Sequence, residues 1–150
     1  MEFTPGKLNT FLLFKLPSAF ISGVRVKQIT TDQCVVSVKH RWINQNPFNS
    51  MYFAVQAMAA ELSTGALVMY HIKQSGKKIS MLVANNKGTF TKKAKGRNTF
   101  TCTDGHLIAE AIANAIATGQ GQTFWMKSVG VDEAGDAVSE MHFEWSIKAK

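Results

Sequence analysis

The sequence of 150 residues predicts an α+β domain in which an antiparallel sheet wraps around one long helix. The first observation behind this prediction is a segment beginning near residue 50 that is rich in Ala and Met and carries little charge. The second is a set of segments in which apolar and polar residues alternate, as on strands with one buried face. No linker, repeat or low-complexity segment interrupts residues 1–150, so we expect a single domain.

A short helix and a hairpin are expected first. Thr4 is a typical helix N-cap, Pro5 suits the first helical position, and Pro17 is expected to end a helix over about residues 5–16. The pattern alternates over residues 24–29 and again over 34–40. The turn at residues 32–33 makes these segments a predicted hairpin.

The long helix follows a polar loop that contains Pro47. Ser50 is expected to cap this helix, which should run to Leu67 or Tyr70. A surface helix would carry a charged stripe, and this segment lacks one. We therefore expect the helix to be enclosed by other structure.

Four strands and one helix are expected in the second half. Asp104 is placed to cap the helix and Gly119 to end it, with an Ile- and Ala-rich apolar stripe between them. A turn over residues 132–136 joins the last two strands. The four predicted strands cover residues 79–90, 97–103, 123–131 and 137–148.

The net charge of +7 is unevenly distributed. No acidic residue occurs between Glu61 and Asp104. A basic block of this kind favours an anionic partner such as nucleic acid, acidic lipid or a phosphorylated cofactor, and it is equally typical of a solvated face. The block contains Lys73, Lys77, Lys78, Lys87, Lys92, Lys93, Lys95 and Arg97.

Two features bear on location. Cys34 and Cys102 lie in strand-like segments without a CxxC partner, so buried free thiols are favoured over a disulfide. No apolar run is long enough to span a membrane, and residues 1–7 lack the basic region and cleavage site of a signal peptide. A cytoplasmic location is the expectation.

Glu61 is the most informative single residue. On a helix it shares a face with Ala54, Ala57 and Met58, while Gln56 and Ser63 lie on the other side. A carboxylate in an apolar setting without partners has a raised pKa, which suits acid–base or nucleophilic chemistry. The alternative is a buried acid that is satisfied by hydrogen bonds and has no catalytic role.

The element order resembles that of the hotdog fold, in which a curved antiparallel sheet wraps a central helix. The segment from Asn46 to Glu61 is similar to the motif of phenylacetyl-CoA-type thioesterases of this fold. The family's Asn and acid keep their separation here, but Tyr52-Phe53-Ala54 replaces His-Gly-Gly at the helix start. The chain looks closest to a poorly characterised branch with Tyr near the helix start and Glu as the acid.

The resemblance implies acyl-CoA hydrolysis with Glu61 as general base or nucleophile. Asn46 would position the water or the carboxylate, and the N–H groups near Phe53 and Ala54 would hold the oxyanion. Thr64 or Ser80 would help to orient the water.

The resemblance also implies a homodimer or homotetramer that binds coenzyme A at a subunit edge as part of the substrate, with no separate cofactor. Position and charge favour a phosphate site made of Lys92, Lys93, Lys95 and Arg97. The four histidines are widely spaced and form no metal-ligand pattern.

Three other functions are weighed against this one. A non-catalytic binder of acyl-CoA or fatty acyl groups is the main alternative. Dehydratase chemistry of the same fold is disfavoured because no His lies at the helix start. Nucleic-acid binding ranks third, since the strands lack the aromatic-rich motif of an RNA-recognition sheet.

Overall fold

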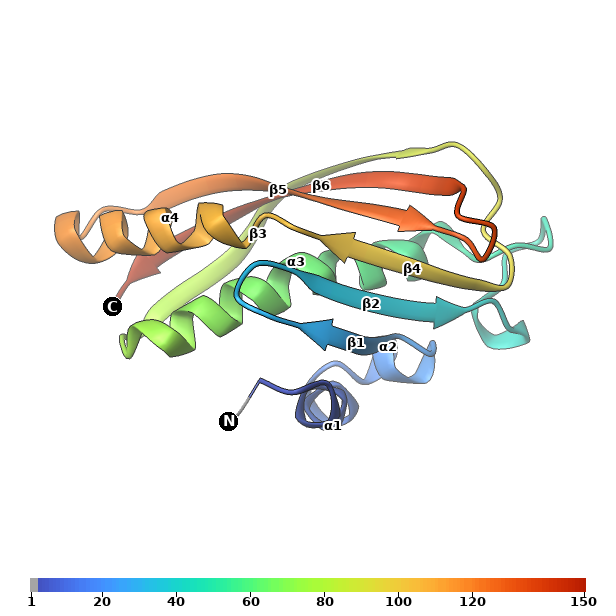
Figure 1. Cartoon of the computed structure of the whole chain (residues 1–150), viewed down its shortest axis with the longest axis horizontal. Coiled ribbons are helices and arrows are strands. Elements are labelled where there is room, and N and C mark those ends of the chain that lie inside the picture. The colour runs from blue at the N-terminus through green and yellow to red at the C-terminus, as the bar shows by residue number, and fades with distance from the viewer. Residues whose placement is uncertain (1–2) are drawn as a thin grey trace.

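The computed structural model describes residues 3–150, and its six strands form one antiparallel sheet in the order β1–β2–β4–β5–β6–β3. Figure 1 shows this sheet curving over α3, with α1 beside β1 and α4 at one end. The elements are α1 (Pro5–Lys15), α2 (Pro17–Ile21), β1 (Arg25–Ile29), β2 (Cys34–Lys39), the 3-10 helix η1 (Trp42–Asn44), α3 (Phe53–Ser75), β3 (Ile79–Phe90), β4 (Arg97–Cys102), α4 (Gly105–Thr118), β5 (Gln122–Val131) and β6 (Ala137–Ala149).

The predicted element order is confirmed, with two additions. All six expected strands are present, and the first two form the expected hairpin. The sequence prediction missed η1, and it treated Pro17 only as the end of the first helix. Pro17 also begins α2, because its fixed φ suits a first helical residue.

The predicted start and end of the long helix were wrong. Ser50 does not cap α3, whose N-cap residue is Tyr52 and has no side-chain cap bond. The Ser50 hydroxyl is instead hydrogen-bonded to the Asn46 side chain. The helix continues to Ser75 and ends at Gly76, which has a φ of +68°. Glycine adopts this left-handed conformation without strain.

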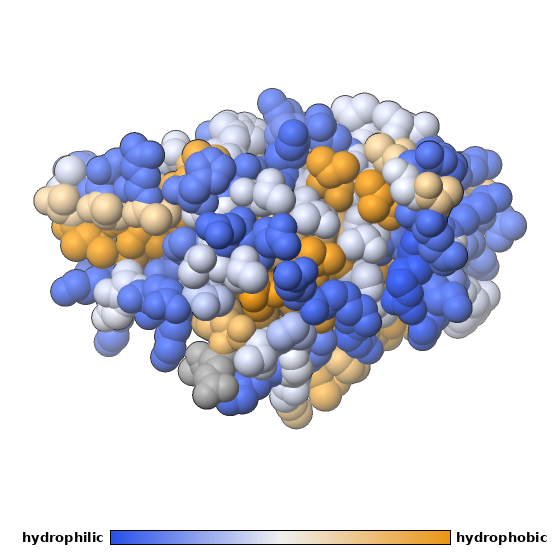
Figure 2. Space-filling model, viewed as in Figure 1, coloured by the Kyte–Doolittle hydropathy of each residue, from blue (hydrophilic) through white to orange (hydrophobic). Residues whose placement is uncertain are grey.

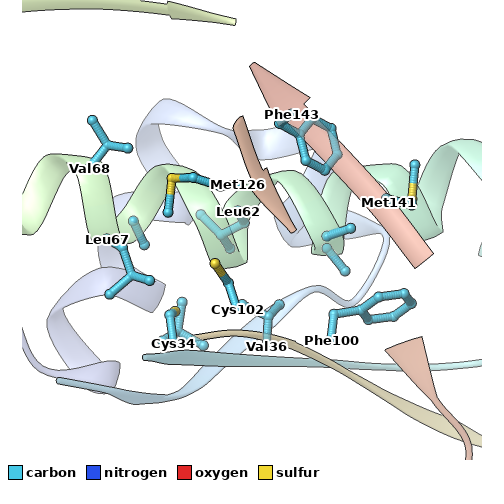
Figure 3. Close-up of a cluster of buried hydrophobic side chains, with 14 of the residues drawn as sticks. Cys34, Val36, Leu62, Leu67, Val68, Phe100, Cys102, Met126, Met141 and Phe143 are labelled. Atoms are coloured by element: carbon cyan, nitrogen blue, oxygen red, sulfur yellow. The ribbon is translucent and has the colours of Figure 1, made fainter. Parts of the chain in front are cut away.

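The core lies between α3 and the concave face of the sheet. Figure 3 shows Leu62, Leu67 and Val68 of α3 in a cluster with side chains from the strands. Residues 62–68 of α3 are all buried, so this part of the helix is covered on every side, and Gln56 and Ser63 are at most 4% exposed. The Ser63 hydroxyl is satisfied there by the Ser128 hydroxyl at 2.7 Å. The expectation of an enclosed helix is therefore confirmed.

The two cysteines are buried free thiols, as expected. Cys34 and Cys102 face each other across β2 and β4 in the strand register. Burial raises the pKa of each thiol to about 12. A thiolate is the reactive form of cysteine, so neither side chain is a nucleophile at neutral pH.

The helix α4 begins where it packs tightly against the β1–β2 turn. A Cβ atom at Gly105 would lie 2.1 Å from the carbonyl oxygen of Thr31, so only glycine fits. Asp104 is the N-cap residue, but its carboxylate accepts from the Lys127 backbone N–H at 2.8 Å instead of capping the helix. The predicted apolar stripe of α4 is buried at Ile108, Ala111, Ile112 and Ala115 but exposed at Ile116, and Gly119 ends the helix as expected.

The surface is mixed. Figure 2 shows hydrophobic side chains reaching this face in several separate places among hydrophilic ones, including over α4. Within residues 3–150, none of the helices has the length and apolar character needed to cross a membrane.

Candidate functional site

Glu61 lies on the middle of α3, between two buried neighbours, Ala60 and Leu62. Its side chain is only partly exposed, and among residues 3–150 its carboxylate has no hydrogen-bond or ion-pair partner. Burial disfavours the charged form and raises the pKa of Glu61 to about 7 from an ordinary value of 4.5. The predicted acid in an apolar setting is therefore present, and no protein group within residues 3–150 satisfies its carboxylate.

Gly65 makes room for Glu61 one turn further along the helix. A Cβ atom at Gly65 would lie 3.0 Å from the ring of Trp145 and 3.3 Å from Oε1 of Glu61. The indole and the carboxylate therefore share the space that a larger residue would fill. The sequence reasoning missed Trp145, because it lies on β6 and no local pattern links it to α3.

Thr64 anchors this arrangement. Its hydroxyl accepts a hydrogen bond from Nε1 of Trp145 at 2.9 Å and donates to the backbone oxygen of Glu61 at 2.8 Å. Its only proton is therefore used within the helix. Thr64 is completely buried and supports the site through these two bonds, and its predicted role in orienting a water molecule stays a prediction.

The bond between Thr64 and Trp145 is testable by substitution. We expect Thr64→Val to destabilise the fold by about 1–2 kcal/mol, because it leaves a buried indole N–H without an acceptor. Urea unfolding measures this change. Thr10→Val is the matched control, since among the described residues the exposed Thr10 hydroxyl bonds only to the Gly6 carbonyl in its own helix. Equal losses in the two variants would contradict a specific role for the Trp145 bond.

A cavity of about 350 Å³ opens beside Glu61. One wall is the α1–α2 junction, and Met58 and Leu62 of α3 form the other. The sequence reasoning did not predict this wall, because it did not predict α2. The cavity lining consists of Lys15, Leu16, Pro17, Ser18, Ala19, Met58, Glu61 and Leu62.

The start of α3 borders a second cavity, of about 390 Å³. Phe53 and Ala54 occupy the first two helical positions, where N–H groups lack intrahelical acceptors. Phe53 is 56% exposed and its ring packs edge-on against Phe90 at a centroid distance of 6.3 Å. The helix start can therefore donate to an oxyanion, with Phe53 narrowing the approach.

Asn46 lines this second cavity and organises the loop before α3. Its Oδ1 accepts from the backbone N–H of Phe48 at 2.9 Å and of Ser50 at 3.1 Å. Its Nδ2 donates to Oγ of Ser50 at 3.0 Å and to the carbonyl of Met51 at 3.3 Å. The side chain is thus engaged in loop structure.

The structure does not bring two predicted site residues to Glu61 within one chain. Asn46 and Glu61 line different cavities that share no residue. Ser80 is exposed on β3, on the face opposite its half-buried neighbour Met81, and its hydroxyl donates to the carbonyl of Lys148 at 3.2 Å. In strands, neighbouring side chains point to opposite faces, so Ser80 points away from α3.

The ammonium group of Lys92 is ion-paired with two carboxylates. Its Nζ lies 2.7 Å from Oδ2 of Asp132 and 2.7 Å from Oδ2 of Asp136, and these contacts raise the pKa of Lys92. The two acids belong to the β5–β6 turn, about 40 residues away in sequence. Two carboxylates therefore neutralise Lys92 in this chain, which weighs against its predicted role in a phosphate site.

Arg97 is also engaged with its surroundings. Its guanidinium donates to the hydroxyl of Ser37 at 3.2 Å, and its backbone N–H donates to Oε1 of Glu133 at 2.7 Å. Lys93 and Lys95 are exposed and have no ion pair within the described part of the chain. Of the four predicted phosphate ligands, these two keep available ammonium groups.

A family model described as a domain of unknown function (DUF4442) matches residues 7–147. No curated protein sequence is detectably similar to this chain. A solved structure from Pseudomonas aeruginosa, described as a protein of unknown function and probable thioesterase, has a TM-score of 0.80 and 21% identity, covering 98% of this chain and 97% of that one.

Two further structures are similar. A protein of unknown function from Chlorobaculum tepidum has a TM-score of 0.85 and 13% identity, covering 97% of this chain and 94% of that one. A thioesterase from Haemophilus influenzae has a TM-score of 0.76 and 13% identity, covering 99% and 93%. At these identities the likeness is one of fold, and it confirms the hotdog fold.

Proposed function

This chain belongs to the DUF4442 family, and from its hotdog fold and its partly buried acid we propose that it hydrolyses an acyl-CoA thioester. The observation that carries the proposal is Glu61, whose unpartnered carboxylate borders a cavity and has a pKa raised to about 7 by burial. A base with a pKa near the working pH is effective in proton transfer. The description of two similar structures as thioesterases supports the same reaction class.

In the general-base route, Glu61 removes a proton from a water molecule as the water oxygen attacks the thioester carbonyl. The carbonyl oxygen becomes an oxyanion, and backbone N–H groups at a helix start stabilise it. Collapse of this intermediate breaks the carbon–sulfur bond and releases the thiol and the carboxylic acid. In the nucleophilic route, Glu61 attacks the carbonyl itself, and the carbon–sulfur bond breaks to release the coenzyme A thiolate and leave an anhydride. Water then hydrolyses this anhydride to the free acid and the regenerated Glu61 carboxylate.

The Glu61 carboxylate and the backbone N–H groups at the start of α3 cannot act on the same thioester within one chain. Glu61 follows Phe53 by eight residues, which places it about 12 Å along the helix axis. One carbonyl group cannot contact both positions. We therefore propose that the protein is a homodimer in which the helix start of one copy serves the Glu61 of the other.

The free edge of β3 is the surface we assign to this dimer. β3 is an edge strand of 12 residues, and an unpaired edge is a ready template for another strand. Val83, near the middle of this strand, pairs with Trp145. The Trp145 ring and the Glu61 carboxylate both lie next to Gly65. Its end residue Phe90 packs against Phe53. Antiparallel pairing of two copies along β3 would place one helix start near the other copy's Glu61.

The proposed dimer can be tested by placing a negative charge on the β3 edge. We expect the purified protein to be a dimer by analytical ultracentrifugation, and Leu82→Glu to weaken the dimer at least tenfold and to lower activity in parallel. Leu82 is 67% exposed on β3, so its replacement leaves the core of one chain intact. Lys27→Glu on β1, the opposite edge strand, is the control. A fully active monomer would contradict the shared site.

The reaction is tested by thiol release from a panel of acyl-CoAs of different chain lengths. Release that exceeds the uncatalysed rate for at least one ester supports the proposal. Tight binding of an acyl-CoA without release across the panel would show a non-catalytic binder instead. Salt-sensitive binding to RNA or DNA without acyl-CoA binding would contradict both functions.

A further inference from the structure

A third cavity, of about 510 Å³, lies where α3 ends and β3 begins. This volume is within the range of roughly 300–1,000 Å³ that is typical of small-molecule sites. It shares no residue with the cavity beside Glu61 or with the one at the helix start. Its lining consists of Phe3, Met69, Ile72, Lys73, Gly76, Lys77, Lys78, Ile79 and Met81.

The walls of this cavity are apolar and come from both elements. Met69 and Ile72 project from the last turns of α3, and Ile79 and Met81 project from the inward face of β3. Phe3 closes one side and packs on the ring of Tyr70 at a centroid distance of 5.1 Å. Flexible methionines adapt to a linear aliphatic chain.

The rim of the cavity is basic. Lys73, Lys77 and Lys78 are exposed, and none of them has an ion pair within residues 3–150. Gly76 has a φ of +68° and turns the chain sharply, so that Lys77 and Lys78 follow directly after the helix end. Three positive charges exceed the partial charge of about −0.5 at a helix C-terminus. The rim therefore attracts anions.

The geometry points to a binding site for a linear aliphatic anion, such as a fatty-acid carboxylate or an alkyl phosphate. The chain lies against Met69, Ile72 and Met81, and the anionic head meets the ammonium groups of Lys77 and Lys78. Within one chain this site shares no residue with the two cavities assigned to thioester hydrolysis, although it lies beside the β3 edge that the proposed dimer would use. It also gives part of the basic block a role that the ion-paired Lys92 does not fill.

The test is calorimetric titration of the full chain with monomeric dodecanoate, dodecyl phosphate and neutral dodecanol. We expect both anions to bind more tightly than the alcohol, and affinity to fall with added salt. Tighter binding of the phosphate would identify a phosphorylated ligand as the natural class, and tighter binding of dodecanoate would identify a fatty acid. Equal affinity for the alcohol and the anions would overturn the proposal.

Variants locate the site. Lys77→Glu with Lys78→Glu should weaken anion binding at least tenfold, whereas Lys27→Glu with Lys39→Glu, the same charge change on β1 and β2, should not. Met69→Trp fills the apolar groove and should also abolish binding, while Met58→Trp fills the Glu61 cavity and should leave it unchanged. Wild-type affinity in the Lys77/Lys78 double variant, or loss of binding in Met58→Trp, would overturn the assignment.

Discussion

Replacing Glu61 by glutamine is expected to lower kcat for thioester hydrolysis by about 10²–10⁴-fold, the usual contribution of a general base. Glutamine keeps the size and shape of the side chain, but its amide cannot accept a proton from water. Because the Glu61 carboxylate has no protein partner within residues 3–150, the substitution breaks no hydrogen bond or ion pair there. The measurement is steady-state thiol release from the best acyl-CoA of the panel.

Two further variants make this result specific. Glu110→Gln is the same chemical change at an exposed position on α4 and should leave the rate unchanged. Glu61→Asp keeps the carboxylate but withdraws it by one methylene, so its rate should lie between those of wild type and Glu61→Gln. If Glu61→Gln hydrolyses the thioester as fast as wild type, Glu61 is only a buried acid and the proposed mechanism is wrong.

The secondary structure was largely predictable because the local patterns are strong. Alternation over β6 and the Ile-rich stripe of α4 are both visible within one segment. The error at the start of α3 arose where contacts between side chains determine the local structure. Ser50 was a plausible cap, but its hydroxyl is hydrogen-bonded to Asn46. The end of α3 did have a local signal, Gly76, which adopts a left-handed conformation directly after Ser75 and which the prediction of an end at Leu67 or Tyr70 did not use.

The candidate site was predictable only in part. The Ala- and Met-rich surroundings of Glu61 indicated a desolvated acid, and the structure has one. The contact with Trp145 was not predictable, because it joins positions about 80 residues apart. For the same reason the sequence could not show that Asp132 and Asp136 neutralise Lys92. A run of basic residues in a sequence does not predict a positively charged surface when acidic residues from a distant turn pair with it in the folded protein.

The raised pKa of Glu61 also predicts how stability depends on pH. Between pH 4.5, where glutamate ordinarily titrates, and about pH 7, the folded protein binds more protons at Glu61 than the unfolded chain does. Stability therefore falls as pH rises through this range and then levels off. A shift of this size corresponds to about 3 kcal/mol of lost stability above pH 7. In Glu61→Gln this contribution disappears, since the amide does not titrate.

Urea unfolding of wild type, Glu61→Gln and Glu110→Gln from pH 5 to pH 8.5 measures this contribution. The stability of Glu61→Gln relative to wild type should increase across the range, while Glu110→Gln should follow wild type. In the same interval kcat should rise with pH and reach a plateau above about pH 7, because only the ionised carboxylate acts as a base. The group that costs stability when ionised would then be the group that supplies activity. A rate that is independent of pH through this interval, with the stability difference intact, would separate the two roles and assign the chemistry to another residue.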